Sequence, residues 1–333
     1  MKRKWIRRVS WILLTPVLLF VILMILLYIP PVQNLLRREV TAYASKATSM
    51  QIQVERIDLR FPLNLLVRGV EVIQQPDTLL SLESLNVRVQ AWPLVKGKVE
   101  VDEVTLSQVA FNSANLIEGM KIKGVLGRFF LQSHGVDLSN ELAVINQTEL
   151  SDTHVQMLMN DTTTTPKDTT ASAPVNWKVD LHKLKLKNVS FSMQLPADSM
   201  RMAAHIGEAF INDAQADLKN QFYELKQFLL SGSSANYDTG AAKPGEGFDA
   251  SHIAVRDIRI GLDSLLYKGR DMNAVIREFS MNERSGLSIT SLTGRAFSND
   301  SIIRIPGIKL QTPHSEIDLS AQTYWELVNI PTT

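Results

Sequence analysis

The side chains best suited to catalysis or metal binding, the six histidines, are scattered along the chain. No two of them have the spacing of metal ligands, and no H-E-x-x-H motif occurs. The chain has no cysteine, which excludes disulfides, thiolate nucleophiles and cysteine-ligated metal centres. Neither a G-x-S-x-G nucleophile elbow, a Walker A loop nor a G-x-G-x-x-G fingerprint is present. We therefore expect no enzyme activity, catalytic residue, metal site or cofactor.

Charge is distributed unevenly along the 333 residues. Seven of the 35 basic residues lie within residues 1–38, where no acidic residue occurs. The rest of the chain holds 28 basic and 34 acidic residues, a net charge of −6. A nucleic-acid-binding protein would concentrate positive charge on its folded part. Nucleic acid is therefore not an expected partner.

Residues 11–29 form an uncharged, apolar stretch that would span about 28 Å as a helix, close to the thickness of a bilayer core. Basic residues at 1–10 place the N-terminus in the cytoplasm. A cleaved signal peptide is the alternative, but its apolar region is usually shorter, about 7–15 residues, and no small-residue cleavage site follows Ile29. We expect a single-pass inner-membrane anchor with the bulk of the chain in the periplasm.

After Pro30 and Pro31, apolar residues recur at helical spacing and predict an amphipathic helix over residues 30–48. Its apolar stripe would either lie on the membrane surface or pack on the first strands of the following domain. Packing on the strands is the favoured alternative.

Residues 49–333 read as one β-domain, because short alternating apolar and polar runs are separated by Gly, Pro, Asn and Asp. With hardly any helix between them, the strands predict an antiparallel meander. Turns are expected at Gln75-Pro76-Asp77, at Ser298-Asn299-Asp300 and at Pro306-Gly307. The expected strands are Ile52–Leu59, Leu65–Ile73, Leu82–Val89, Val99–Phe111, Trp177–Leu195, Ile253–Leu262, Leu287–Leu292, Ser301–Leu310 and Glu316–Ala321.

Composition indicates flexible loops at about residues 160–176 and 238–250. The stretch Phe210–Leu230 fits either a helix or a β-hairpin, and the hairpin is favoured.

An internal repeat supplies the candidate site. Residues 98–113 align without a gap on residues 178–193, and their apolar positions coincide. Fainter copies occur around Ile52–Leu59 and Ile253–Ile260. The candidate groove residues are Val99, Val101, Val104, Leu106, Val109 and Phe111 in the first copy and Val179, Leu181, Leu184, Leu186, Val189 and Phe191 in the second.

In each copy, successive apolar residues are separated alternately by two and by three positions, as in Val99, Val101 and Val104. In a regular strand a step of three moves the side chain to the other face. A β-bulge at each such step would keep all of them on one face and bend the strand, giving a strongly curved sheet with one continuous apolar face. The alternative is the core of an ordinary β-sandwich, which periodicity alone favours.

The order of a basic start, one anchor, Pro-Pro, a short helix and then Ile52-x-Val54-x-x-Ile57-x-Leu59 resembles the N-terminal part of AsmA-like proteins. It is most similar to the TamB-type members of Bacteroidetes-like bacteria, and Ser285–Ala321 is the closest stretch. The resemblance covers essentially the whole chain, although TamB-like chains are several times longer.

The resemblance implies a mainly β protein, in which an elongated, curved antiparallel sheet forms an open trough behind the anchor. It also implies membrane phospholipid as the partner, and an outer-membrane assembly barrel as a second partner if a longer chain exists. The function would be to support lipid transport to the outer membrane, or protein assembly in it. A membrane-tethered structural or interaction β-sandwich without lipid cargo is the alternative.

Overall fold

The computed structural model describes residues 29–60, 63–90, 100–137, 140–159, 176–240 and 243–327. These residues form one helix, a single large sheet and two short 3-10 helices. The helix is α2 (Pro30–Thr48), and the strands are β1 (Gln51–Arg60), β2 (Asn64–Gln74), β3 (Asp77–Val89), β4 (Val101–Asn112), β5 (Met120–Asp137), β6 (Leu142–Met159), β7 (Lys178–Leu195), β8 (Met200–Asp217), β9 (Phe222–Asp238), β10 (His252–Lys268), β11 (Asp271–Glu283), β12 (Ser288–Ile289), β13 (Ser291–Ser298), β14 (Ile302–Gln311) and β15 (Glu316–Tyr324), with 3-10 helices η1 (Pro196–Asp198) and η2 (Trp325–Leu327).

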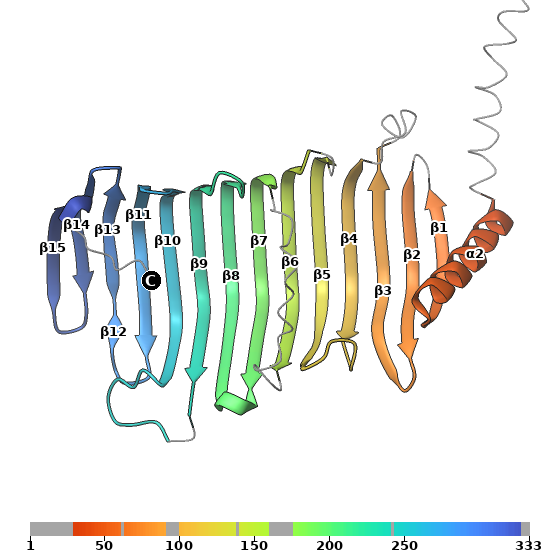
Figure 1. Ribbon diagram of the computed structural model, residues 1–333, viewed down its shortest axis with the longest axis horizontal. Helices are drawn as coiled ribbons and strands as arrows, with labels where there is room; N and C mark the ends of the chain where they lie inside the picture. The colour runs from red at the N-terminus through yellow and green to blue at the C-terminus, as the bar shows by residue number, and fades with distance from the viewer. Residues whose placement is uncertain are drawn as a thin grey trace, which may run out of the picture.

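Fourteen strands lie side by side in chain order, and β12 pairs with β11 beside this path (Figure 1). The expected antiparallel meander is correct for every pair but one. Strands β6 and β7 run parallel, with Leu142 opposite Lys178 and Leu158 opposite Gln194. Parallel neighbours need a long return connection, and 18 residues separate Met159 from Lys178.

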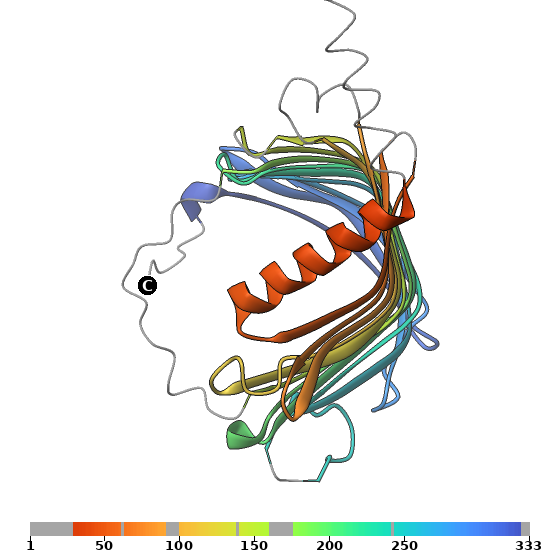
Figure 2. The same cartoon turned by 90° about the vertical axis from the view of Figure 1, so that its right-hand side faces the viewer.

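The sheet is open and strongly curved, and seen along its length it forms a trough (Figure 2). The helix α2 lies at one end, on the concave side. No second sheet covers either face within the residues that the structure describes. The β-sandwich that periodicity alone favours is therefore wrong for this part of the chain.

Most strand expectations are confirmed, and β3, β10 and β15 are longer than expected. The strand expected at Leu287–Leu292 is wrong, because the chain breaks there into β12 and the start of β13. The stretch Phe210–Leu230 is the hairpin of β8 and β9, and the chain between Asp238 and His252 is irregular wherever it is described. The turn expected at Pro306-Gly307 is wrong, because both residues lie inside β14. The register of β14 and β15 shifts there, and a bulge accommodates a proline that has no N–H to donate.

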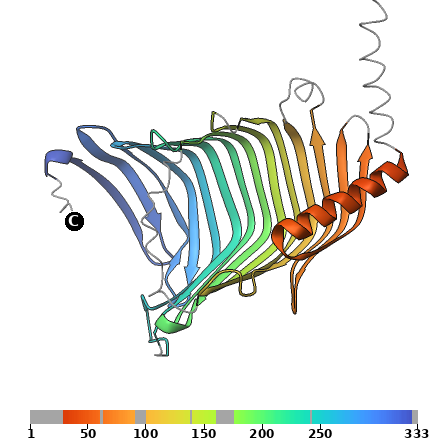
Figure 3. The ribbon, with the colours of Figure 1, turned by 45° about the vertical axis from the view of Figure 1, so that its right-hand side comes forward.

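The helix expected over residues 30–48 is present as α2, and it packs against β1 rather than standing apart (Figure 3). Prolines at its first turn and a left-handed Ser49 after its last residue set its two ends. Three of its side chains bond to β1: Gln33 donates to the Leu59 carbonyl, Arg37 donates to the Glu55 carbonyl at 2.6 Å, and the Ser45 hydroxyl accepts from the Ile52 amide. The helix thus covers the free edge of the sheet.

Within the described residues, no helix is both long and apolar enough to cross a membrane. The expected cytoplasmic segment 1–10 and the expected anchor 11–29, apart from Ile29, lie outside those residues. The loop expected at 160–176 also lies outside them, except for Asn176.

Candidate functional site

The candidate site is built from rows of apolar side chains that run across the strands. Residues directly opposite each other in a sheet share one face, so the strand register shows which side chains lie together. One such row crosses every strand from β1 to β11 without a polar residue. This central row consists of Ile57, Val67, Leu85, Leu106, Phe129, Leu150, Leu186, Ala209, Leu230, Ile260 and Phe279.

The register brings the two copies of the repeat to the same heights in the sheet. Leu106 and Leu186 share the central row, and equivalent rows join Val104 with Leu184, Val109 with Val189 and Phe111 with Phe191. Val179 and Leu181 belong to two further rows, which run through Ala143 and Ile145 of β6 to Val136 and Ser133 of β5. Val101 lies at the start of β4, and Val99 lies outside the described residues.

The structure adds residues that the sequence did not single out. Strands β5, β6, β8 and β9 contribute Phe129, Leu150, Ile211 and Phe228 to the same rows. The internal repeat gave no signal for them, because β5 and β6 interrupt the pattern with Gly127 and with polar residues such as Thr148. Only their pairing with recognised strands identifies them.

The apolar rows face the concave side of the sheet. Side chains converge inside a bend and spread apart outside it, so those on the concave side are less exposed. In β7 the candidate groove residues are half-buried, apart from Phe191 at 38% exposure. The intervening Lys183, Lys185 and Lys187 are exposed. The lysines therefore lie on the convex face.

The spacing of three residues is explained by a bend that crosses neighbouring strands at one height, which we call the crease. Between Leu106 and Val109, and between Leu186 and Val189, the residue before the valine has a left-handed backbone: Gln108 has a φ of 49° and Asn188 a φ of 52°. Gly69, Asp152, Gly232 and Asp257 occupy the same place in other strands, also with positive φ. Glycine, asparagine and aspartate tolerate this conformation best.

The crease differs from the β-bulge expected at this step. A bulge would insert an extra residue into one strand and shift the register, but the register is unbroken where β4 meets β5 and where β7 meets β8. Both partners carry the extra residue at the same height. A bulge with a register shift does occur at the Val101–Val104 step, between β3 and β4. The crease bends neighbouring strands together and keeps the apolar side chains on one face.

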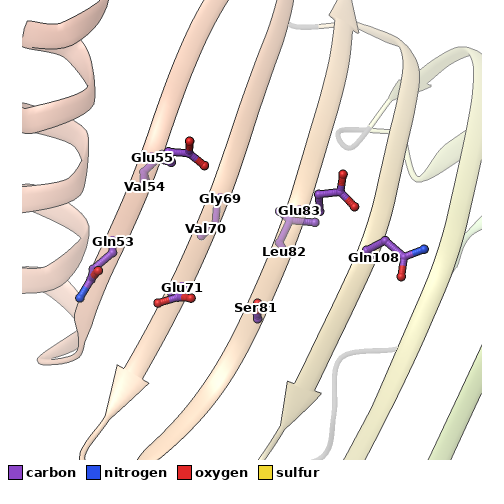
Figure 4. Close-up of a pocket in the computed structure, with 10 residues that line it drawn as sticks. All are labelled: Gln53, Val54, Glu55, Gly69, Val70, Glu71, Ser81, Leu82, Glu83 and Gln108. Carbon is purple, nitrogen blue, oxygen red and sulfur yellow. The ribbon is translucent and has the colours of Figure 1, made fainter.

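The outer side of the crease is polar. Glu55, Gly69, Glu83 and Gln108 follow one another across β1 to β4 and line a shallow hollow of about 590 Å³ (Figure 4). The Cβ of an alanine at position 69 would stand 2.6 Å from a carboxylate oxygen of Glu55. Farther along, Asn188 donates a hydrogen bond to Asp152 at 2.8 Å. The close approach of Glu55 to Gly69 leaves no room for a side chain there, and the hydrogen bond between Asn188 and Asp152 links β7 to β6 at the bend.

A second crease runs through β8 at Asp213, which also has a positive φ. Its carboxylate lies 3.1 Å from His182 on β7 and 3.6 Å from Lys226 on β9. The hydrogen bond from His182 and the charge of Lys226 lower the pKa of Asp213. All three side chains are exposed, so this charge ladder stabilises the bend only weakly.

On the concave face, an apolar depression lies over β7 to β10. It has a volume of about 240 Å³ and is lined almost wholly by carbon. Ala214 and Ala216 form its floor, while Leu181, Leu225 and Leu265 form its walls. Tyr223 borders it and lies 6.0 Å from Tyr267, ring centre to ring centre. We call this depression the alanine hollow.

Among the described residues, no group of three histidine, aspartate or glutamate side chains is placed to hold a metal ion. The shape and polarity of the sheet characterise the site: a long apolar concave face, uncovered beyond β1, with a charged convex face behind it. No protein-family model and no curated protein matches the chain.

Proposed function

We propose that the concave face binds the acyl chains of membrane phospholipid. The observation that carries the proposal is the set of apolar rows, which stay uncovered from β2 to β11 within the described residues, beyond the strand against which α2 packs. Soluble proteins rarely leave an apolar patch of this extent exposed unless something binds there.

The energetics favour a chain of methylene groups. Each buried methylene contributes about 0.8 kcal/mol, so a dozen of them on the rows would contribute roughly 10 kcal/mol. The headgroup would stay in water at the edge of the trough. A row of leucine, isoleucine and phenylalanine offers no hydrogen bonds, which suits a ligand recognised by its apolar part alone.

The wider biological role that we propose follows the resemblance to AsmA-like, TamB-type proteins. The chain would be anchored in the inner membrane by residues 11–29, with its trough in the periplasm. It would support lipid transport to the outer membrane or the assembly of proteins there. The open trough and the edge-covering helix next to the anchor are consistent with lipid entering from the bilayer. The sandwich alternative loses its support, because the apolar face is not covered by a second sheet in the described residues.

Photo-crosslinking in whole membranes tests the proposal. The full chain would carry p-benzoylphenylalanine at Leu186 on the central row or at Lys185, its neighbour on the convex face. We expect phospholipid adducts at position 186 and only background at position 185. Equal capture at the two positions would refute lipid binding by the concave face.

A further inference from the structure

The two long edges of the trough differ in chemistry along β7 to β10. At the upper edge in Figure 1, β9 begins and β10 ends, which places Tyr223 and Tyr267 there. At the lower edge, β7 ends and β8 begins. We call the two the tyrosine edge and the methionine edge. Concave positions near the methionine edge are occupied by Met157, Met193 and Met202, which are opposite one another in three successive strands, and the row continues into β9 with Tyr237. The tyrosine edge differs by having a pair of tyrosines, Tyr223 and Tyr267, on adjacent strands.

The two edges also differ in the charged residues that they carry. The tyrosine edge carries four basic residues, Lys178, Lys219, Lys268 and Arg270, and four acidic ones, Asp180, Asp217, Glu224 and Asp271. At the methionine edge acidic residues outnumber basic ones two to one: Arg201 and Lys243 stand among Asp198, Asp238, Glu246 and Asp249. The methionine edge is therefore the more negative of the two, and a phosphate group is repelled from it more strongly than from the tyrosine edge. Tyrosine also suits a boundary between hydrocarbon and water, since its ring is apolar and its hydroxyl polar.

We propose that the trough binds phospholipid in one orientation over β7 to β10, with the phosphate headgroup at the tyrosine edge and an acyl chain in the alanine hollow. This inference rests on the proposed function. The hollow opens beside Tyr223, so a chain whose headgroup sits at that edge enters it directly. Its volume of about 240 Å³ equals about eight groups of water size, at ~30 Å³ each, which matches a stretch of methylenes.

The length of the chain fixes where its end lies. Half of a bilayer core of about 30 Å is ~15 Å, which corresponds to four or five strand residues at about 3.3 Å each. Starting from Tyr223, the chain end therefore reaches the row of Leu184, Ile211 and Phe228. The methionine row, at Met193, lies nine residues beyond Leu184 in β7 and stays out of reach.

Two photoactivatable phospholipids test the orientation on the full chain in vesicles. One carries a diazirine at the end of its acyl chain and the other in its headgroup, and peptide mass spectrometry locates the adducts. We expect the chain probe to label the row of Leu184, Ile211 and Phe228. The headgroup probe should label the β8–β9 turn and Tyr267.

A double variant, Ala214→Leu with Ala216→Leu, fills the floor of the hollow and should lower labelling by the chain probe about tenfold. The matched control is Ala204→Leu with Ala235→Leu, which adds the same volume to a pair of concave residues near the methionine edge. The control should leave labelling at Phe228 unchanged.

The outcomes separate the two proposals. Chain-probe adducts at Phe191 and Met193, with the headgroup probe at the methionine edge, would overturn the orientation. Adducts spread over the concave rows and insensitive to the hollow-filling variant would overturn the hollow, while leaving lipid binding intact. Adducts confined to the convex face, or none at all, would overturn the proposed function itself. The labelling map of the unmodified chain decides between these outcomes even if the double variant does not fold.

Discussion

We predict that Asn188 stabilises the crease mainly because asparagine tolerates a left-handed backbone, and less through its side-chain hydrogen bond. Its φ of 52° lies in the left-handed region, which costs a residue with a Cβ about 1–2 kcal/mol and is especially unfavourable for a β-branched residue. Asn188→Val also removes the 2.8 Å hydrogen bond to Asp152, worth ~0.5–1 kcal/mol at an exposed site. We expect this variant to lower the free energy of unfolding by about 2–3 kcal/mol.

Asn188→Gly is the matched control. It loses the same hydrogen bond but relieves the backbone cost, so its free energy of unfolding should stay within about 0.5 kcal/mol of the parent. Urea unfolding of the full chain in mild detergent, followed by circular dichroism, measures both. With a slope of ~3 kcal/mol per molar urea, the valine variant shifts the midpoint by up to about 1 M. Equal midpoints for the valine and glycine variants would refute the role of the left-handed conformation.

Three further predictions follow from other contacts. Gly207→Ala places a Cβ 2.5 Å from the Gly232 carbonyl oxygen and should lower the free energy of unfolding in urea by about 1–3 kcal/mol. The control Gly307→Ala, whose Cβ would have no heavy atom within 4 Å, should change that free energy by under ~0.5 kcal/mol. Similar free-energy changes for the two variants would contradict the close packing of β8 on β9. Arg37→Ala removes the cover on the Glu55 carbonyl and should increase self-association through the β1 edge in sedimentation experiments, while Arg38→Ala should not. Asp249 accepts hydrogen bonds from the amides of Gly245 and Ser251 and from His252, which lower its pKa from the ordinary 3.8. The stabilisation from these bonds is therefore present above that pH and is lost as the pH falls through the lowered pKa. The protection factor of the Ser251 amide, the ratio of its intrinsic to its observed exchange rate at the same pH, should fall only below about pH 4, and Asp249→Asn should lower it at pH 7.

Strand positions were predictable where the local pattern was strong. β1, β2, β4, β7 and β14 match expected segments to within two residues at each end. β5, β6, β8 and β11 have less regular patterns: β6 places Thr148 and Thr153 at concave positions, which breaks the apolar alternation that marks a strand. Those strands are held by their neighbours on both sides rather than by their own sequence.

The candidate site was predictable in part for the same reason. The spacing of the repeat indicated which side chains of β4 and β7 share a face, because a strand's own backbone geometry decides that. The spacing did not indicate how the backbone keeps these side chains on one face. A bulge in one strand and a crease through two paired strands give the same spacing of apolar residues. The alanine hollow was also inaccessible to sequence reasoning, because it arises from small residues on β8 flanked by larger ones on β7 and β9.

The sequence by itself determined the β-rich class, the helix over residues 30–48 and the apolar faces of the repeat strands, since each follows from periodicity within a short stretch of chain. Only the tertiary structure decided that β6 and β7 run parallel, that the crease lines up across the strands and that the apolar face stays open. A buried sandwich core and an uncovered trough require the same alternation along a strand. The difference lies in what packs against the face, and that depends on segments far apart in the sequence.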